Sequence, residues 1–561
     1  MSTEQFFFNG VNGATGGYLM PSLTPEQVAK IAQGEEFDPD HLLELQKKNR
    51  QVKGIDEEFA PIEGVDPKDL AQTGWGVIFA HNADPGIKEA LRPLLNLRRE
   101  QATKKKEHYY QEYTDHKAYR PGESKNSFLA RHKVGPGPAD PDKMPYYLLI
   151  VGDPETIPYR FQYQLDVQYA VGRIHFDTLE EYAQYAQSVV AAETGKVSLS
   201  RHATFFGVKN NNDKATQLSA DDLIKPLAEL MQKDQPNWSV ETLVKDDTTK
   251  ARLGQLLGGS ETPSLLFTAS HGMGFPSGHE RQLRHQGALL CQDWPGTFQG
   301  EEPISEDFYF SADDITDDAR LLGLIAFNFA CYGAGTPQLD DFAHKKDAFS
   351  TERLTIAPHA FVARLPQRLL GHHKGGALAV VGHVERAWGC SFVWPDDKHE
   401  KTRQLGVFQS ALKRMMEGHP VGSAIEYFNE RYAELSSDLS SVLEDIKYGA
   451  GIESESLARM WTANNDARSY CIIGDPAVKL AIGDVASERP VIEAVTLSTT
   501  SAPKEKLFDE SLWKEAEMDL IQSLEQFLEK AQQAQVDESE QAQATVLEIK
   551  ILLDKLSKPS K

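Results

Sequence analysis

Short runs of apolar residues alternate with stretches of helical character along most of the chain. The first runs are WGVIFA (75–80) and YYLLIV (146–151), and the last is YCIIG (470–474). Continuous apolar runs of this length are typical of strands buried on both faces of a parallel sheet. Strands that alternate with helices build a mostly parallel sheet flanked by helices, so the sequence predicts an α/β fold. The other predicted strands are VQYAVGRI (167–174), ATFFGV (203–208), WSVETLV (238–244), SLLFTAS (264–270), LIAFNFA (324–330) and ALAVVG (377–382).

Helical patterns separate most of these runs. The first is a short helix after the cap-like Thr24-Pro25-Glu26, followed by a long polar helical stretch over 85–113. Further helices are predicted at 179–193, 216–233, 250–257, 362–371, 405–417, 421–436 and 453–462.

The length and texture of the chain predict several parts. The chain has 561 residues, and domains average roughly 150 residues. We expect an N-terminal arm or cover (1–60), a smaller α/β subdomain (61–196), a larger α/β domain (197–484), a linker (485–508) and C-terminal helices (509–561). In the last part, apolar residues at helical spacing predict a helical hairpin. These residues are Leu512, Leu520, Ile521, Leu524, Phe527 and Leu528.

The composition excludes several classes of protein. Asp and Glu number 83 against 59 Lys and Arg, a net charge of -24, which disfavours general binding to nucleic acid. No stretch approaches 18 consecutive apolar residues, and the N-terminus lacks the pattern of a signal peptide. Four cysteines cannot build a disulfide framework. We therefore expect a cytoplasmic protein that does not bind membranes.

A histidine and a cysteine each follow a predicted strand directly. SLLFTAS continues into His271-Gly272, and LIAFNFA continues into Cys331-Tyr332-Gly333. In such sheets, catalytic groups gather beyond the carboxyl ends of the strands. A thiol nucleophile with an acid–base partner needs this arrangement, and the glycines let a substrate backbone approach. The alternative is a small buried hydrophobe beside a polar cap. Cys471 fits that alternative, and Cys291 and Cys390 have no comparable histidine.

The ordered segments TASHG, NFACYGAG, GALAVVGHVERAWGCSF and IIGDPAVKL resemble the caspase-like (clan CD) cysteine peptidases. The CHAT domains and the gingipain-type (C25) peptidases are the most similar branches. YYLLIVGDPETIPYRFQYQLDVQYAVGRI also resembles the gingipain type, and together the resemblance covers about 145–480. It implies that 197–484 is a catalytic domain with a caspase-like sheet, preceded by a second, smaller and non-catalytic α/β subdomain (61–196).

The resemblance also implies a mechanism. Cys331 would attack the scissile carbonyl, and His271 would protonate the leaving amine and later activate water. The backbone N–H groups of Gly272 and Cys331 would bind the oxyanion. In the gingipain type an acid can orient the histidine. Glu155, in the Gly-Asp-Pro-Glu turn, is the candidate here, with a plain turn carboxylate as the alternative.

The resemblance further implies a substrate pocket. Asp166 corresponds to the pocket acid of the gingipain type, where it would pair with an arginine or lysine before the scissile bond. Trp388 and Glu385 lie where the family builds a pocket wall. Ordinary loop packing and surface ion pairs are the alternatives for all three.

We expect a cysteine endopeptidase that needs no cofactor or metal ion. The acidic run 313–318 lacks the pattern of a calcium loop, and neither a phosphate loop nor a GxSxG serine motif is present. The partners of such an endopeptidase would be a protein or peptide substrate and a regulatory protein or activating ligand. We expect its activity to be gated by the partner, the ligand or cleavage. A role in bacterial defence follows by analogy with CHAT proteins. The alternatives are a catalytically silent scaffold that binds protein partners and a non-proteolytic thiol enzyme.

Overall fold

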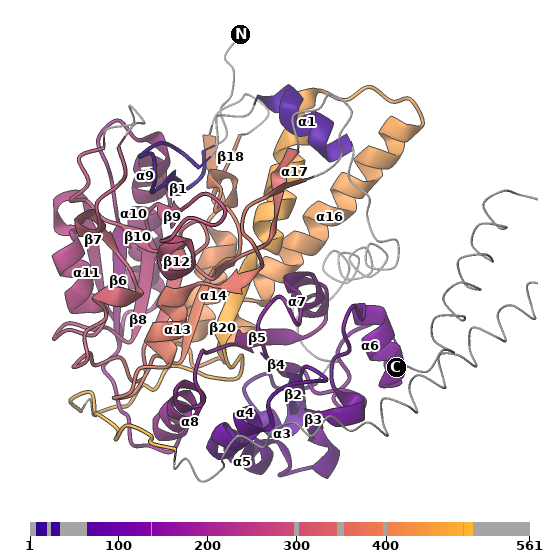
Figure 1. Ribbon diagram of the computed structural model, residues 1–561, viewed down its shortest axis with the longest axis vertical. Helices are drawn as coiled ribbons and strands as arrows, with labels where there is room; N and C mark the ends of the chain where they lie inside the picture. The colour runs from indigo at the N-terminus through magenta and orange to yellow at the C-terminus, as the bar shows by residue number, and fades with distance from the viewer. Residues whose placement is uncertain are drawn as a thin grey trace, which may run out of the picture. The chain divides into compact units, whose positions relative to one another are not determined.

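The computed structural model describes residues 7–19, 24–33, 64–135, 137–296, 302–344, 353–395, 401–485 and 487–497. In this part of the chain, ten strands form one sheet in the order β3-β2-β4-β5-β20-β17-β12-β8-β6-β7 (Figure 1). In that order the strands are β3 (Tyr110–Tyr113), β2 (Trp75–Phe79), β4 (Tyr147–Val151), β5 (Ala170–Ile174), β20 (Tyr470–Gly474), β17 (Ala379–His383), β12 (Ile325–Phe329), β8 (Leu265–Ala269), β6 (His202–Gly207) and β7 (Ser239–Val244).

The sheet consists of two parallel halves. Neighbouring strands run parallel everywhere except between β17 and β20, which are antiparallel. The carboxyl ends of β6, β8, β12 and β17 therefore lie at one edge of the sheet, and the amino end of β5 lies at the same edge. The predicted α/β class, with a mostly parallel sheet flanked by helices, is confirmed.

Aromatic residues fix the register of the central strands. Phe205, Phe267 and Phe327 are register partners on β6, β8 and β12, and their rings stack at 5.7 Å and 4.8 Å. Phe408 and Phe428, from two helices, pack onto Phe327 at 6.0 Å and 5.8 Å. A slip of one residue would turn every one of these side chains to the other face, so the buried aromatic stack specifies one register.

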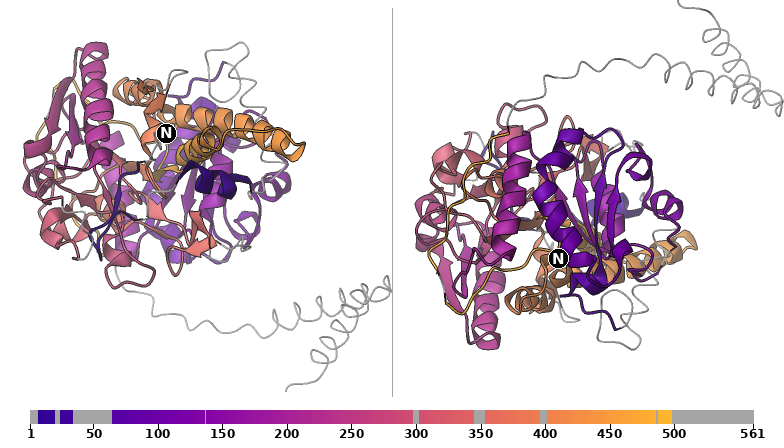
Figure 2. Two further views of the ribbon diagram at one scale, coloured as in Figure 1. Left: turned by 90° about the horizontal axis from the view of Figure 1, so that it is seen from above. Right: turned by 90° about the horizontal axis from the view of Figure 1, so that it is seen from below.

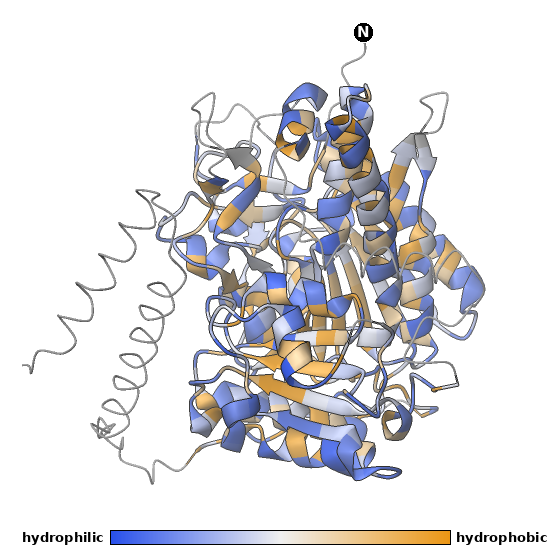
Figure 3. Cartoon of the chain, turned by 90° about the vertical axis from the view of Figure 1, so that its right-hand side faces the viewer, coloured by the Kyte–Doolittle hydropathy of each residue, from blue (hydrophilic) through white to orange (hydrophobic). Residues whose placement is uncertain are grey.

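Helices cover the sheet, and apolar residues concentrate on the strands between them (Figures 1 and 3). In the first half they are α3 (Leu70–Thr73), α4 (Pro85–Ala90), α5 (Arg92–Ala102), α6 (Lys125–Arg131), α7 (Tyr159–Asp166) and α8 (Leu179–Glu193). In the second they are α9 (Lys214–Leu218), α10 (Lys225–Asp234), α11 (Lys250–Leu256), α12 (Gln282–His285), α13 (Arg364–Leu370), α14 (Gly406–Met416), α15 (Val421–Ala424), α16 (Glu426–Lys447) and α17 (Ser454–Arg468). No helix in the described ranges combines the length and apolar character needed to cross a membrane.

Within the described residues, the predicted strands and helices are found, with one difference. The predicted long helix over 85–113 ends at Ala102, and its last residues form the edge strand β3. Tyr110 stacks on Trp75 of β2 at 5.8 Å, and this buried contact outweighs the polar, helix-like composition of the segment. The predicted division between 61–196 and 197–484 stays a prediction, although β20 pairs with β5 across it. The predicted C-terminal hairpin (509–561) lies outside the described residues.

The N-terminal segment enters a second, small sheet. β1 (Gly10–Asn12) pairs in parallel with β9 (Gly272–Gly274), followed by β10 (Leu289–Leu290) and β11 (Tyr309–Phe310). Val11 belongs to the buried cluster of this sheet together with Met273. Further along the chain, α1 (Pro25–Gln33) packs against α17, as seen at the top of Figure 1 and from above in Figure 2. Pairs of short strands lie outside these sheets: β13 (Gly335–Thr336) with β16 (Phe361–Val362), β14 (Leu339–His344) with β15 (Arg353–Thr355), and β18 (Val393–Pro395) with β19 (Lys401–Arg403).

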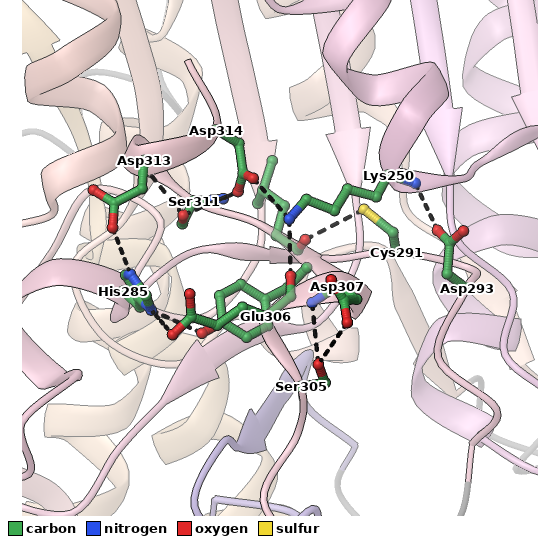
Figure 4. A network of polar contacts seen from close by, with 12 residues as sticks. Lys250, His285, Cys291, Asp293, Ser305, Glu306, Asp307, Ser311, Asp313 and Asp314 are labelled. Carbon is green, nitrogen blue, oxygen red and sulfur yellow. Dashed lines mark hydrogen bonds and ion pairs between the residues drawn. The ribbon is translucent and has the colours of Figure 1, made fainter. Parts of the chain in front are cut away.

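The acidic run 313–318 is bound to cationic and capping groups (Figure 4). Asp313 pairs with the buried His285, and Asp314 pairs with Lys250 and accepts hydrogen bonds from Ser311. Nearby, Cys291 is buried and donates to the carbonyl of Leu289. Among the described residues no cluster of side chains suited to a metal ion is found. This region therefore acts as a structural network of ion pairs.

One buried ion-pair network joins the last strand to the first half of the molecule. Arg98 of α5 donates to Asp475 at 2.7 Å, directly after β20, and forms two bonds of 2.6 Å and 2.7 Å with Glu193 of α8. Trp75 of β2 donates to the other oxygen of Asp475 at 2.9 Å. Arg98 and Asp475 are fully buried, so neither charge can turn to water if its partner is lost.

We expect Arg98→Ala to lower the free energy of unfolding by about 3–5 kcal/mol, because it leaves two buried carboxylates without their cation. Arg98→Lys should recover only part of this loss, since an ammonium group cannot make the paired bonds. Urea unfolding followed by tryptophan fluorescence measures both. Arg99→Ala is the matched control: Arg99 is half exposed, and its pair with Glu112 is worth less than about 1 kcal/mol. Equal effects of the two alanine variants would contradict the role given to Arg98.

Candidate active site

Cys331 and His271 lie beside each other at one edge of the sheet. β12 ends at Phe329 and β8 at Ala269; these are register partners, and each site residue follows two positions later. The two backbones are very close there. A Cβ atom built on Gly272 would lie 1.8 Å from the carbonyl oxygen of Cys331, so only glycine fits. The structure thus brings together the histidine and the cysteine that the sequence singled out.

An aspartate binds the imidazole of His271. The distance from Nε2 of His271 to Oδ2 of Asp213 is 2.5 Å, and both side chains are fully buried. A carboxylate only accepts hydrogen bonds, so Nε2 carries the hydrogen atom. The other ring nitrogen, Nδ1, is buried and has no hydrogen-bond partner among the described residues. It is the nitrogen that is left to exchange a proton with a reacting group.

Asp213 reaches His271 from the connection that follows β6. It is the N-cap of α9 and accepts from Ala215 N–H at 3.1 Å, from the Thr216 hydroxyl at 2.7 Å and from the Tyr18 hydroxyl at 2.7 Å. Burial raises the pKa of Asp213, but His271 and these hydrogen bonds outweigh it and lower the pKa to about 2. The carboxylate is therefore ionised and can stabilise a positive charge on the imidazole.

Two backbone N–H groups converge on one peptide oxygen. Gly272 donates to the carbonyl of Asn9 at 2.8 Å, and Cys331 donates to the same oxygen at 3.0 Å. Paired N–H donors beside a nucleophile are the arrangement that stabilises the oxyanion of acyl transfer. The same two groups were expected as oxyanion donors from the sequence, and in the structure they hold a peptide carbonyl of the chain itself.

The backbone around Asn9 lies along the loop after β17 as an antiparallel strand. Phe8 forms a bridge with Trp388, Asn9 N–H donates to the carbonyl of Ala387 at 2.9 Å, and Gly389 N–H donates to the carbonyl of Phe7 at 2.9 Å. Extended peptides are bound in this way by enzymes and domains that add a strand to an exposed edge. Residues 7–9 thus lie as an added strand along 387–389 and lead to Cys331, and the space that they fill is called the cleft below.

The thiol of Cys331 is closed off from solvent. Its Sγ accepts a hydrogen bond from Ala387 N–H at 3.3 Å, and burial raises the pKa of the thiol above its usual value. A Cβ atom on Gly10 would lie 2.7 Å from Sγ, so the N-terminal segment rests directly on the sulfur. The next residue, Tyr332, has a φ of 59°, a left-handed conformation that costs about 1–2 kcal/mol for a residue with a side chain. Such strain is often found at functional sites.

Trp388 lies in the wall of this cleft. Its ring meets that of Phe8 edge-on at 5.0 Å and packs against Phe342 at 4.8 Å. Behind it, Asp466 accepts from Trp388 N–H at 2.9 Å and binds His383 at 3.2 Å. The contact of Trp388 is with the residue before Asn9, so it lines the cleft one position away from the residue whose carbonyl faces the thiol.

Glu385 is bound within the protein. It is buried and forms an ion pair with Arg386, which also holds Asp340 through two bonds of 2.9 Å and 2.8 Å. Burial raises the pKa of Glu385 despite the charge of Arg386. This cluster supports the loop that carries Ala387 and Trp388. Arg386 already pairs with the Glu385 carboxylate, which was expected to bind a basic side chain of the substrate.

The other two predicted residues lie apart from the His271 pair. Glu155 has a 70% exposed side chain that lies 4.0 Å from His359, and Asp213 holds the position beside His271 that Glu155 was expected to take. Asp166 ends α7 and accepts from the N–H of Val171 at 3.0 Å, at the start of β5. The expected contact of Glu155 with His271 is wrong, because the turn that carries Glu155 follows β4, in the other half of the sheet.

Sequence reasoning missed Asp213 and the N-terminal segment. Asp213 carries a visible signal, since it follows a strand and three asparagines and precedes a helix, as an N-cap does. The contact of Asp213 with His271 depends on β6 lying next to β8, and this order of strands cannot be predicted from a local sequence pattern. Asn9 lies in FFFNG, far from the catalytic motifs in sequence.

Comparisons with known proteins give structural likeness only. The sequence matches no protein-family model and no curated protein. One similar solved structure is described as a protease, with 12% identity over 73% of this chain and 80% of the other and a TM-score of 0.39. Another is a complex of the pro- and mature domains of RgpB from Porphyromonas gingivalis, with 12% identity over 72% and 79% and a TM-score of 0.36. The chemistry proposed below rests on this chain's own geometry.

We expect Gly272→Ala to destabilise the protein, because the new methyl group would meet the backbone of Cys331 and not a movable side chain. Overpacking of this kind costs about 1–3 kcal/mol or more, which urea unfolding would measure. Gly406→Ala is the control: a Cβ atom there meets nothing within 4 Å, and alanine suits the first turn of α14. An unchanged unfolding midpoint for Gly272→Ala would contradict the close approach of the two strand ends.

Proposed function

We propose that the chain is a cysteine endopeptidase with Cys331 as nucleophile and His271 as general acid and base. One observation carries the proposal: a peptide carbonyl is held by two N–H groups beside the thiol, on a backbone paired as a substrate strand. A buried cysteine that served only for packing would need neither the paired donors nor the strand-binding edge.

The residues can perform acyl transfer in two steps. Cys331 gives its proton to Nδ1 of His271 and attacks the carbonyl carbon, while Gly272 and Cys331 N–H groups bind the oxyanion. The imidazolium, stabilised by Asp213, then protonates the leaving amine as the C–N bond breaks. Water next attacks the thioester with Nδ1 as base, which releases the acid and restores the thiol.

The alternatives predict different behaviour. A silent scaffold could keep the fold without the unpaired, buried Nδ1 of His271 or the strained conformation of Tyr332. A Cys331→Ala protein that still performed its biological task would favour the scaffold. A non-proteolytic thiol enzyme would use the same residues without peptide hydrolysis, so a peptide assay separates it from the peptidase.

Several features belong to the proposal by resemblance. A cytoplasmic location, gating by a partner, ligand or cleavage, a CHAT-like relationship and a role in bacterial defence are predictions from the sequence. Gating has support in the structure, because the segment 7–19 closes the cleft over the fully buried Cys331. A preference for a basic residue before the scissile bond is a further prediction, expected from Asp166 and Glu385.

Peptide hydrolysis is tested in a protein whose cleft is opened. Gly10→Trp cannot fit between Leu19 and Cys331, whose atoms lie 2.4–2.9 Å from a Cβ atom at Gly10, so the segment must leave the cleft. We expect this variant to cleave peptides, and expect added His271→Ala or Asp213→Asn to lower kcat/KM by about 10²–10⁴. Added Cys331→Ala should abolish turnover.

Gly17→Trp is the matched control, since the nearest atom to a Cβ there is the hydroxyl of Thr15 at 3.8 Å. It introduces the same side chain in the same segment without forcing residues 7–10 away from Cys331. Labelling with iodoacetamide reports whether Cys331 is open in each variant. An open, labelled Gly10→Trp protein that hydrolyses no peptide would overturn the peptidase and favour a non-proteolytic enzyme.

A further inference from the structure

The bond between Asn9 and Gly10 lies where a substrate's scissile bond belongs. The carbonyl of Asn9 takes both oxyanion donors, and Gly10 lies against the sulfur of Cys331. We propose that residues 7–12 are an internal substrate, that the enzyme cleaves its own chain between Asn9 and Gly10, and that its specificity pocket selects asparagine. This inference rests on the proposed peptidase activity.

The pocket that receives the Asn9 side chain offers hydrogen-bond acceptors. Asn9 is only 1% exposed, and its Nδ2 donates to Ser219 Oγ at 3.1 Å and to the Ser270 carbonyl at 3.2 Å. The hydroxyl of Ser219 donates to the carbonyl of Thr216, so its hydrogen is already used and the oxygen can only accept from Asn9. Two neutral acceptors match the two hydrogens of one amide group.

This chemistry discriminates against other side chains. An aspartate would place an acceptor against two acceptors in a buried pocket, which leaves all three groups without a donor. An arginine or lysine is longer and would bring a charge to neutral acceptors instead of to a carboxylate. A glutamine carries the amide one methylene further out. The pocket therefore fits the chain's own Asn9, and in this proposal asparagine takes the place of the basic residue expected from the sequence.

The same segment of chain builds the pocket and orients the histidine. Asp213, which binds His271, starts α9, and Ser219 begins the π-helical turn η3 (Ser219–Ile224) that follows it. Short π-helical insertions are frequent at functional sites. The pocket and the catalytic pair therefore share one rigid support.

Glycine is required on the other side of the bond. A Cβ atom on Gly10 would collide with Leu19 Cδ1 at 2.4 Å and with Cys331 Sγ at 2.7 Å. Leu19 and Tyr18 fold back over the segment through the bridge of Val11 with Tyr18. The chain thus closes its own cleft over an asparagine–glycine bond, which keeps outside peptides from Cys331 until the segment is cut.

The step balances within the groups present. Cys331 Sγ forms a thioester with the Asn9 carbonyl carbon, the Asn9–Gly10 bond breaks, and the nitrogen of Gly10 takes the proton that His271 received from the thiol. Water then hydrolyses the thioester, giving a carboxylate on Asn9 and a new amino terminus at Gly10. Residues 1–9 can leave, while β1 stays paired with β9 and the cleft beside Trp388 opens.

Intact-mass spectrometry and N-terminal sequencing test the cleavage. The purified wild-type chain should begin at Gly10, and the Cys331→Ala chain should keep its original terminus at or beside Met1. Asn9→Asp should stop cleavage, and so should Asn9→Arg. Asn12→Asp is the matched control, because Asn12 lies in the same segment and its side chain accepts a bond from Ala14 N–H outside the pocket. Two results would overturn the proposal: a wild-type chain that keeps its first nine residues, or an Asn9→Arg variant that is cut as well as the wild type.

Peptides in solution separate this inference from the peptidase itself. The open Gly10→Trp protein should cleave a peptide with the sequence of residues 5–12, and versions with Asp, Arg or Ala in place of Asn9 should react at least 100-fold more slowly. Ser219→Ala should lower kcat/KM for the asparagine peptide roughly 2- to 10-fold, the loss of one hydrogen bond, and leave the slow alanine peptide unchanged. Cleavage of the arginine peptide in preference would overturn the asparagine pocket and keep the peptidase. Cleavage of no peptide, with Cys331 labelled, would overturn both.

Discussion

The in-register parallel pairing of β8 with β12 is the constraint on which the site depends. Phe267 and Phe327 are partners in the ladder and stack in the core, so the ends of the two strands are level. His271 and Cys331 each follow two residues later, which places both residues at neighbouring strand ends without a long loop to position either one. The small residue Gly272 completes the arrangement, since only a glycine lets the two backbones come so close.

Burying a carboxylate costs desolvation energy, and the hydrogen bonds to Asp213 show what offsets this cost. Asp213 accepts hydrogen bonds from its own helix and from Tyr18 as well as from His271. The hydroxyl of Tyr18 belongs to the N-terminal segment that covers the cleft. Residues 10–19 of this segment therefore contribute to the electrostatics beside His271, and Tyr18 would stay in place when residues 1–9 leave.

The fold could be predicted from the sequence to a large extent, because buried parallel strands such as SLLFTAS and LIAFNFA carry a strong local signal. His271 and Cys331 followed from the same signal, since a residue directly after such a strand must lie at the sheet edge. Asp213 could not be placed, because its role depends on β6 pairing with β8, a contact between segments 60 residues apart. Glu155 was predicted from the resemblance of its turn to the gingipain type. That turn follows β4, in the other half of the sheet, and the strand order that separates it from His271 could not be read from the sequence. β3 was missed because its polar residues fit a helical pattern, whereas the contact that favours the strand, Tyr110 against Trp75, is not visible in the local sequence.

The N-terminal segment explains how a reactive thiol can be buried. Burial raises the pKa of Cys331, which favours the neutral thiol and lowers its reactivity toward external groups. For the internal peptide this limit is offset, because its carbonyl already lies on the two N–H donors and no entropy is lost in bringing it there. A site closed in this way can react with its own chain before it reacts with any other. Loss of residues 1–9 would remove the pairing with 387–389 and free the two N–H donors that hold the Asn9 carbonyl, whereas Gly10 onward is retained by β1 in the small sheet. In the proposed enzyme, self-cleavage and opening of the cleft would be one event, and the segment that covers Cys331 would also define the peptide that the site is shaped to bind.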